Sequence, residues 1–242
     1  MAASISPDTL FHLGAFPVTN TVLDTLLVDL LLISVALYIT KHHSLVPGFF
    51  QSLIEMLFEA FDNMIKSVAA DRATKIFPYV MTFFLFIILA NWTGLTPILT
   101  GMGILHDGEI IPLIRSASTD LNVTFSLAVI SLIATHTMSI QTLGLKQYIG
   151  RFISWNPLFL FIGLLELVLE FAKIVSFSFR LFGNVFVGKV LLHSASALSL
   201  FIIPIPIMLY EMFVGAIQAS IFAMLTMAFM AILTTSHNAE AH

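Results

Sequence analysis

The sequence has no cysteine and few charged residues. The absence of cysteine from its 242 residues excludes a disulfide framework, an iron–sulfur cluster and a zinc site built on thiolates. Only 10% of the residues are charged, whereas a soluble domain carries about 25%, and 58% of the residues are hydrophobic. Ten basic residues against fourteen acidic ones give a net charge of −4, which supplies no basic surface for nucleic acid. We therefore expect a membrane protein that binds no nucleic acid.

Four long stretches contain no aspartate, glutamate, lysine or arginine. They cover residues 76–106, 121–145, 190–210 and 212–239, and each exceeds the roughly 20 residues that a helix needs to cross a bilayer core. A further candidate span, 21–40, carries only two aspartates. Lipid cannot hydrogen bond to the backbone, so we expect these spans to be helices. The period-2 alternation of a membrane β-barrel is missing.

Residues 47–71 follow a different pattern, with a broad apolar stripe on one side and charged residues on the other. The charged residues are Glu55, Glu59, Asp62 and Lys66. This pattern predicts an amphipathic helix that lies on the membrane surface or packs beside the bundle.

Basic residues are distributed unequally between the connections. Six of them fall in the stretches 41–75 and 146–157, and only Arg115 falls in the loop 98–118. The excess of positive charge predicts that the first two stretches are cytoplasmic and that the N-terminus lies outside. No basic residue precedes Lys41, so we expect insertion without a cleaved secretory signal.

Residues 156–190 are apolar enough for lipid but contain five charged side chains. A charge at bilayer depth costs about 2.5–3.5 kcal/mol on insertion scales, so these charges need partners, a water-filled cavity or a tilted helix. Steps of three or four residues place most of the polar side chains on one helix face. They are Glu166, Glu170, Lys173, Arg180 and Asn184. Glu170 and Lys173 are spaced closely enough to form an ion pair.

Arg180 has no acidic residue within one helical turn on either side. A guanidinium stays charged when it is buried, so Arg180 requires an anion from elsewhere, and another subunit could supply it. Two simpler interpretations are that Arg180 reaches an interface with its long side chain or pairs with Glu211.

A second set of polar residues follows Arg180. Nine steps of about 100° put Lys189 on the opposite side of an unbroken helix, with His193 as its i+4 neighbour. Pro204 and Pro206 favour a turn after this helix, so that the last helix packs back against it. Polar groups of both helices then line a seam. They are Arg180, Asn184 and Lys189 on one helix and Glu211 and Gln218 on the other.

The run from Ser178 to Asn184 (SFRLFGN), followed by Gly188, resembles the signature of the ATP synthase a subunit family. Glu166 and Lys173 precede the arginine by fourteen and seven residues, as in that family. Further matches extend the resemblance over about residues 20 to 236. They are Gln218 in the last helix, the DLNVT run that starts at Asp120 and includes Asn122, the NWTGLTP run over 91–97, and Val46-Pro47-Gly48 with Gln51.

The resemblance implies an all-α membrane protein with about five membrane-embedded helices and an amphipathic surface helix. The last two helices are implied to be long, tilted and arranged as a hairpin against a rotating ring of c subunits. The expected segments of this single membrane domain are an outer tail over 1–20, spans over 21–41, 76–97 and 120–142, the amphipathic helix over 47–71, and the hairpin helices over 157–193 and 197–236.

The function implied by the resemblance is ion translocation between two offset half-channels. Arg180 matches the arginine that attracts the ionised ring carboxylate and blocks leakage between the half-channels. Asn184 and Gln218 match positions that line or support this contact. Supporting polar roles are implied for Glu166, Glu170, Lys173, Ser176, His193, Asp120 and Asn122. The expected partners are the c-ring, the b subunits of the peripheral stalk and the lipid of an energy-transducing membrane, either a bacterial plasma membrane or an organellar inner membrane.

One position departs from the family pattern. Where the family often carries glutamate or histidine nine residues after the arginine, this chain has Lys189, and the last helix carries Glu211. We hypothesise that these two residues form an ion pair that shapes the outer half-channel, with a proton-relay role for Lys189 as the alternative.

Other functions fit the sequence less well. A small ion channel or a secondary transporter would need a gate or a substrate site of its own and often has an inverted repeat, which this chain lacks. A membrane-embedded hydrolase would need a nucleophile with a base or a set of metal ligands, and we interpret His136 as a packed or interfacial histidine. No nucleotide-binding motif is present, so we expect no bound nucleotide, no metal, no cofactor and no catalytic residue in this chain. Proton and sodium coupling both remain open.

Overall fold

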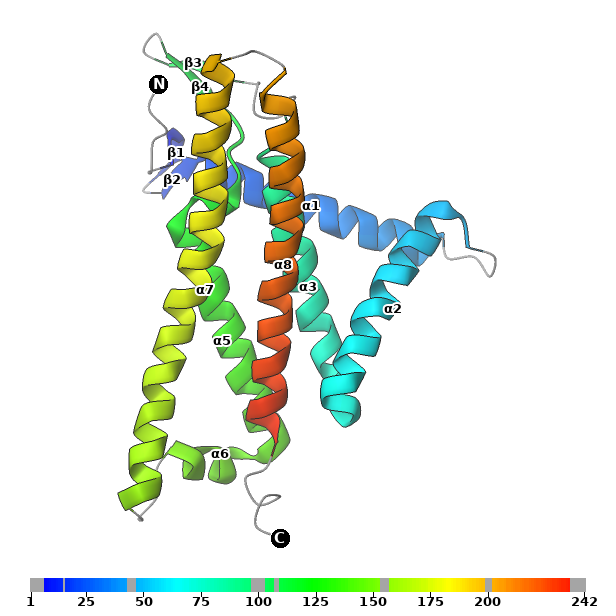
Figure 1. Ribbon diagram of the computed structural model, residues 1–242, viewed down its shortest axis with the longest axis vertical. Coiled ribbons are helices and arrows are strands. Elements are labelled where there is room, and N and C mark those ends of the chain that lie inside the picture. Colours follow the sequence, from blue (N-terminus) through cyan, green and yellow to red (C-terminus); the bar gives the residue numbers. More distant parts are fainter. Residues whose placement is uncertain are drawn as a thin grey trace.

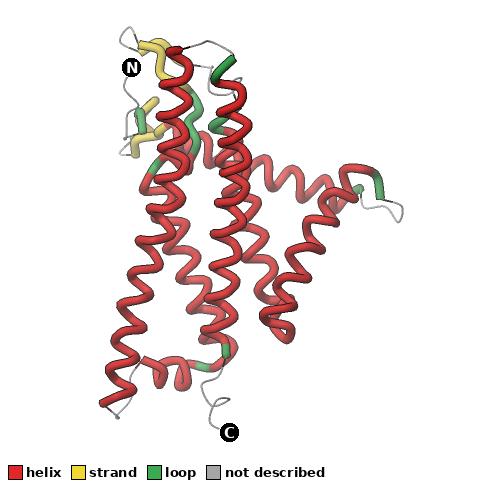
Figure 2. Tube along the Cα trace, in the orientation of Figure 1, coloured by secondary structure: helices red, strands yellow, loops and turns green. Residues whose placement is uncertain are grey.

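The computed structural model describes residues 7–14, 16–42, 47–96, 103–106, 109–152, 157–198 and 202–235. Nearly all of the described chain is helical (Figure 2). The helices are α1 (Asn20–Lys41), α2 (Phe49–Ala69), α3 (Ala73–Thr93), α5 (Leu121–Leu143), α6 (Leu145–Phe152), α7 (Pro157–Leu198) and α8 (Pro204–Thr234). Short 3₁₀ turns cover Ala70–Arg72 and Ala117–Thr119.

Four helical stretches of the described chain are long and apolar enough to cross a membrane. They are α1, the joined stretch Phe49–Thr93 that contains α2 and α3, α5 and α8. The predicted all-α membrane protein is therefore confirmed. The number of five membrane-embedded helices stays a prediction, because it depends on the 42-residue helix α7 with its charged side chains.

Helices α7 and α8 run side by side where α7 ends and α8 begins and diverge towards the start of α7, and α3 and α5 pack behind them (Figure 1). Helix α5 contacts both α7 and α8, and α3 packs against α8. Helix α1 leaves this bundle sideways, and α2 returns from its far end towards the start of α3 (Figure 1). The bundle therefore places residues of α1, α3, α5 and α8 around α7.

The core of the bundle is built from aromatic and small side chains. The ring of Phe222 on α8 lies 5.5 Å from that of Phe83 on α3 and 4.9 Å from that of Phe177 on α7, measured between centroids. Buried hydroxyl groups are paired across the same interface, with Ser131 and Thr226 joined by a 2.9 Å hydrogen bond. Such pairing matters because an unpaired polar group in an apolar environment costs about 1–3 kcal/mol.

Helix α2 has the expected two-sided character. Phe61 and Ile65 are buried, and α2 packs on α3 through this side. Phe49, at the start of α2, is 88% exposed, and the charged Lys66 and Asp62 pair with each other at 2.5 Å on the exposed side.

The hairpin helices differ from the predicted ranges at the connection between them. Helix α7 continues to Leu198 instead of ending near 193, and α8 begins at Pro204 instead of 197. Proline fits the first turn of a helix because the backbone N–H that it lacks would have no partner within the helix there. Helix α8 therefore begins at Pro204.

Two short antiparallel strand pairs lie outside the helices and were not predicted. Strand β1 (Thr9–Leu13) pairs with β2 (Phe16–Thr19), and β3 (Gly103–His106) pairs with β4 (Glu109–Pro112). Gly14, between β1 and β2, has a φ of 65°, which glycine adopts without strain. Both strand pairs lie at the end of the bundle where α7 ends and α8 begins (Figure 1).

Candidate functional site

Arg180 lies on the exposed side of α7. The residues next to it, Phe177, Ser178 and Leu181, are buried and hold α7 in the bundle, with Ser178 Oγ 3.2 Å from Thr124 Oγ1 of α5. The Arg180 guanidinium donates a long 3.5 Å hydrogen bond to Ser176 Oγ. No ion pair within 4.0 Å joins Arg180 to an acidic residue among the described residues, so the interpretation that Arg180 pairs with Glu211 is wrong. The helix presents a permanent positive charge on its outer surface.

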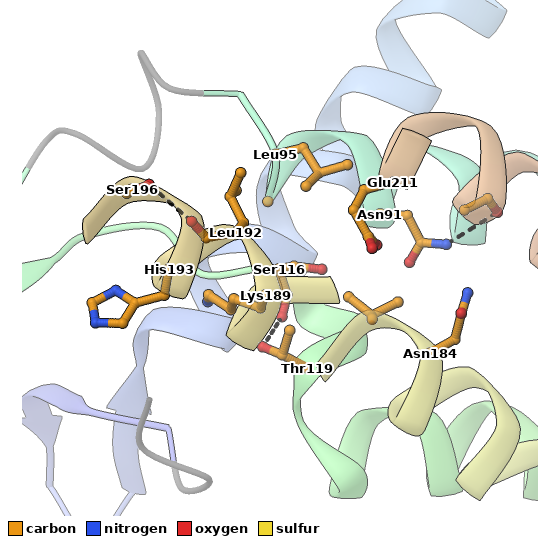
Figure 3. Close-up of a pocket in the computed structure, with 13 residues that line it drawn as sticks. Asn91, Leu95, Ser116, Thr119, Asn184, Lys189, Leu192, His193, Ser196 and Glu211 are labelled. Carbon is orange, nitrogen blue, oxygen red and sulfur yellow. Dashed lines mark hydrogen bonds between the residues drawn. The ribbon is translucent and has the colours of Figure 1, made fainter. Parts of the chain in front are cut away.

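Beyond Arg180, towards the end of α7, the bundle contains a cavity of about 220 Å³ (Figure 3). Helices α3, α7 and α8 and the segment before α5 contribute its walls. The lining residues are Asn91, Gly94, Leu95, Ser116, Thr119, Asn184, Val185, Lys189, Leu192, His193, Ser196, Glu211 and Gly215. The structure thus brings together four of the residues that the sequence singled out, namely Asn184, Lys189, His193 and Glu211.

Glu211 reaches the cavity where α8 faces Gly188 of α7. A Cβ atom added to Gly188 would overlap the Glu211 carboxylate, so the end of this side chain would have to move aside. Helix α3 is fixed to the same part of α8, because Asn91 Nδ2 donates to Gly215 O at 3.3 Å and Trp92 Nε1 donates to Met212 O at 3.1 Å. Glu211 is only 9% exposed and is therefore a carboxyl group buried at a helix crossing.

Lys189 does not pair with Glu211. In the described part of the chain no ion pair within 4.0 Å joins the two residues, and the predicted pairing is wrong for this structure. Gly188 occupies the side of α7 that faces Glu211, and the next residue points about 100° away from it. Lys189 instead interacts favourably with the charges of Asp24 and Asp8 and unfavourably with that of Arg115.

Asp24 is a candidate site residue that the sequence analysis did not assign. It is fully buried in α1, and its Oδ2 accepts a 2.7 Å hydrogen bond from the backbone N–H of Ala117. Its Oδ1 is buried and accepts no hydrogen bond from the described residues. The available signal was an acidic residue inside an apolar span. Asp29 gives the same signal but is exposed, so sequence alone could not separate the two.

A buried polar layer surrounds Asp24 in the segment before α5. Asp120 caps α5 by accepting from the Asn122 N–H at 2.9 Å, and it also accepts from Thr21 Oγ1 of α1 at 3.2 Å. Arg115 is buried and donates from Nε to Thr119 Oγ1 at 3.0 Å. Burial lowers the pKa of the Arg115 guanidinium, and the carboxylates of Asp8 and Asp120 oppose this shift. The layer connects α1 to the wall of the cavity.

A second polar cluster lies nearer the start of α7. Lys173 Nζ is 2.7 Å from Glu170 Oε1, which confirms the predicted ion pair. His136 of α5 is a packed histidine, as predicted, because its Nε2 lies 3.6 Å from Glu170 Oε2 and its Nδ1 lies 3.1 Å from the Tyr148 hydroxyl of α6. Periodicity within one helix could predict the contact of Glu170 with Lys173, but not the contacts of His136 with Glu170 and Tyr148, which join different helices.

The remaining predicted residues are spread over the bundle. Gln218 is buried in α8 without lining the cavity, and Glu166 is partly exposed near the start of α7. Asn122 is exposed, and Asp120 belongs to the buried layer described above. Four predicted residues therefore line the cavity near the end of α7, Glu170 and Lys173 form the cluster nearer its start, and Arg180 lies exposed between the two groups. The other predicted residues belong to neither group.

The chain is similar to known subunits of one membrane complex. The family model described as ATP synthase A chain matches residues 22–231. A protein from Moorella thermoacetica named ATP synthase subunit a is 31% identical over 233 residues, which cover 96% of this chain and 99% of that protein. A subunit a from Legionella pneumophila (strain Corby) is 30% identical over 222 residues, or 91% of this chain and 89% of that protein.

The name of a third relative specifies the ion, unlike the names of the first two. The protein from Propionigenium modestum named ATP synthase subunit a, sodium ion specific, is 33% identical over 215 residues, which cover 88% of this chain and 73% of that protein. The family match spans all the clusters described above, from α1 to α8. The chain therefore belongs to the ATP synthase A chain family.

Proposed function

We propose that this chain is the stator subunit a of an F-type ATP synthase. In this proposal it carries protons, or sodium ions, through two half-channels that meet at a rotating ring of c subunits. Flow down the electrochemical gradient supplies about 2.3 kcal/mol per charge for each 100 mV of membrane potential, and this drives rotation. Catalysis of ATP synthesis belongs to partner subunits, and the b subunits of the peripheral stalk hold the chain in place.

The observation that carries the proposal is the exposed Arg180 on α7. Among the described residues it hydrogen bonds to the neutral Ser176 and forms no ion pair with a carboxylate. A guanidinium at membrane depth without an anion is costly, so a carboxylate from another subunit is the partner that best accounts for it. A ring carboxylate that passes Arg180 is held in its ionised form and has to release its ion on one side of the arginine.

The outer cavity supports the role of one half-channel. It is large enough for several water molecules, and its walls hold Asn184, Lys189, His193 and Glu211. It lies on the outer side of Arg180 if the basic connections are cytoplasmic, with the N-terminus outside an energy-transducing membrane. An ion that enters there has a polar route towards the surface of α7 that carries Arg180.

The proposal is tested by replacing Arg180 with alanine in the assembled complex. ATP-driven ion pumping into inverted membrane vesicles is the readout, measured as acidification or as sodium uptake. We expect Arg180→Ala to abolish coupled pumping while the complex remains assembled. Lys66→Ala serves as the control, since Lys66 is an exposed cation of α2 that pairs with Asp62 at the surface. Coupled pumping retained by Arg180→Ala would refute the assignment.

A further inference from the structure

His136 of α5 lies between side chains of two other helices. Its Nδ1 is 3.1 Å from the Tyr148 hydroxyl of α6, and its Nε2 is 3.6 Å from Glu170 Oε2 of α7. Glu170 is only 6% exposed, and its Oε2 is buried and accepts no hydrogen bond from the described residues. An imidazole nitrogen therefore faces an unsatisfied oxygen of a buried carboxylate.

Among Glu170, Lys173 and His136, the charges balance when His136 is neutral. The other oxygen of Glu170, Oε1, contacts Lys173 Nζ at 2.7 Å, and the same Nζ lies 4.0 Å from the centre of the Phe229 ring of α8. Glu170 and Lys173 thus cancel each other. A proton on His136 raises the charge of the cluster from zero to plus one.

Both protonation states of His136 have suitable partners. In the neutral ring, Nδ1 accepts from the Tyr148 hydroxyl, and the N–H at Nε2 points to Glu170. In the protonated ring, Nδ1 donates to the Tyr148 oxygen, and Nε2 donates to the carboxylate of Glu170. The hydroxyl can donate or accept, so the ring gains and loses a proton without leaving a partner unsatisfied.

A cavity gives this cluster room for water. It has a volume of about 250 Å³ and is lined by His136, Tyr148 and Glu170 together with apolar side chains of α5, α6 and α7. One water molecule occupies about 30 Å³ in the liquid, so the cavity has room for several. Water beside the imidazole would supply and accept the proton.

We propose that His136 and Glu170 form a buried proton-exchange site that serves the inner half-channel. His136 takes a proton from hydronium in the cavity, which leaves water, and it returns the proton to water there. Glu170 stabilises the imidazolium. This proposal rests on the proposed function, in which ions leave on the inner side of Arg180. Glu170 lies on α7, the helix that also carries Arg180. The positive charge that the cluster gains would act on those leaving ions.

The test is passive proton conduction through the membrane sector, in vesicles from which the catalytic sector has been removed. The rate is measured against the pH of the side that faces α6. For the unmodified protein we expect the rate to change over the pH range in which histidine titrates. His136→Gln is expected to slow conduction severalfold and to flatten this pH profile. His42→Gln is the matched control, because His42 is exposed at the end of α1 and stacks on Tyr38.

A second variant keeps the test informative if His136→Gln fails to assemble. Tyr148→Phe preserves the ring and removes the hydroxyl that accepts from the protonated imidazole. Loss of that charge-assisted hydrogen bond should move the midpoint of the pH profile to lower pH. If every variant that assembles gives the same pH profile as the unmodified protein, the proposal of a proton-exchange site is overturned. Because Arg180→Ala is scored by coupled pumping and not by this profile, failure of the site and failure of the proposed function are distinguished.

Discussion

The two polar clusters of α7 hold their charges in opposite ways. At the inner cluster Glu170 and Lys173 are in direct contact at 2.7 Å and His136 completes the group. At the outer cavity no ion pair within 4.0 Å joins Lys189 to Glu211 in the described part of the chain, and polar groups of four elements surround about 220 Å³ of space. The ion pair of Glu170 and Lys173 stabilises helix packing by direct contact and has a cavity of about 250 Å³ beside it, whereas the charges around the other cavity do not contact each other. One helix therefore carries both a contact ion pair and separated charges, each beside a cavity.

The largest effect is expected from breaking the inner ion pair. Lys173→Met leaves the buried Glu170 carboxylate without its cation, and since Lys173 itself is only partly buried we expect a loss towards the lower end of the about 3–5 kcal/mol typical of a buried pair. Thermal unfolding of the purified complex in detergent measures this loss. Lys66→Met is the control, because the exposed pair of Lys66 and Asp62 is worth only about 0–1 kcal/mol. Equal losses in the two variants would remove the distinction between the inner pair and a surface pair.

A smaller effect is expected at the outer cluster from Asp24→Ala. The substitution leaves the buried N–H of Ala117 without its acceptor at a cost of about 1–3 kcal/mol, and it removes a favourable charge from Lys189. We expect lower thermal stability and slower ATP-driven pumping. Asp29→Ala is a matched control on the same helix, because Asp29 is exposed and its replacement should change stability by about 0.5 kcal/mol or less. If Asp29→Ala were as harmful, burial would not explain the role of Asp24.

A comparable or smaller effect is expected from Gly188→Ala, which tests the contact between α7 and α8. The new methyl group overlaps the Glu211 carboxylate, which is the movable end of a flexible side chain, so we expect a cost at or below the lower end of the about 1–3 kcal/mol of overpacking. Pumping is expected to fall because Glu211 is displaced from the cavity wall. Gly183→Ala, on the same helix, adds a methyl group with no atom within 4 Å and should be tolerated. Vesicle pumping and thermal unfolding of both variants decide whether close approach is needed only at Gly188.

The smallest effect is expected for the coupling between Lys189 and Glu211. A double-mutant cycle with Lys189→Met and Glu211→Gln should give an interaction energy below about 1 kcal/mol, because the charges are not in contact. The same cycle with Lys173→Met and Glu170→Gln should give a clearly larger value. A strong coupling between Lys189 and Glu211 would indicate that these two residues form an ion pair after all. The two clusters would then not differ in how they hold their charges.

The sequence predicted those features that depend on one segment at a time. Long uncharged stretches predicted membrane helices because lipid offers no hydrogen bonds to the backbone. The helical period of 3.6 residues predicted the pairing of Glu170 with Lys173, three residues apart, and it left Arg180 without an acidic neighbour. Alternating apolar and charged residues predicted the two-sided helix α2.

The sequence could not predict which residues of different helices meet. His136 was interpreted as a packed or interfacial histidine, but its partners Glu170 and Tyr148 lie on two other helices and could not be named. Asp24 is 165 positions before Lys189, and nothing in the intervening sequence indicates their interaction. The two strand pairs were also missed, because their short strands lie in segments expected to be an outer tail and a loop.

The sequence alone determined that this chain is a helical membrane protein with a charged α7 whose arginine lacks a local counter-ion. Only the tertiary structure decided how the other charges are grouped. The rotation of each helix about its axis selects which residue faces its neighbour, and a change of one residue turns the side chain by about 100°. Position 188 therefore faces Glu211, while Lys189 lines the cavity without pairing with Glu211.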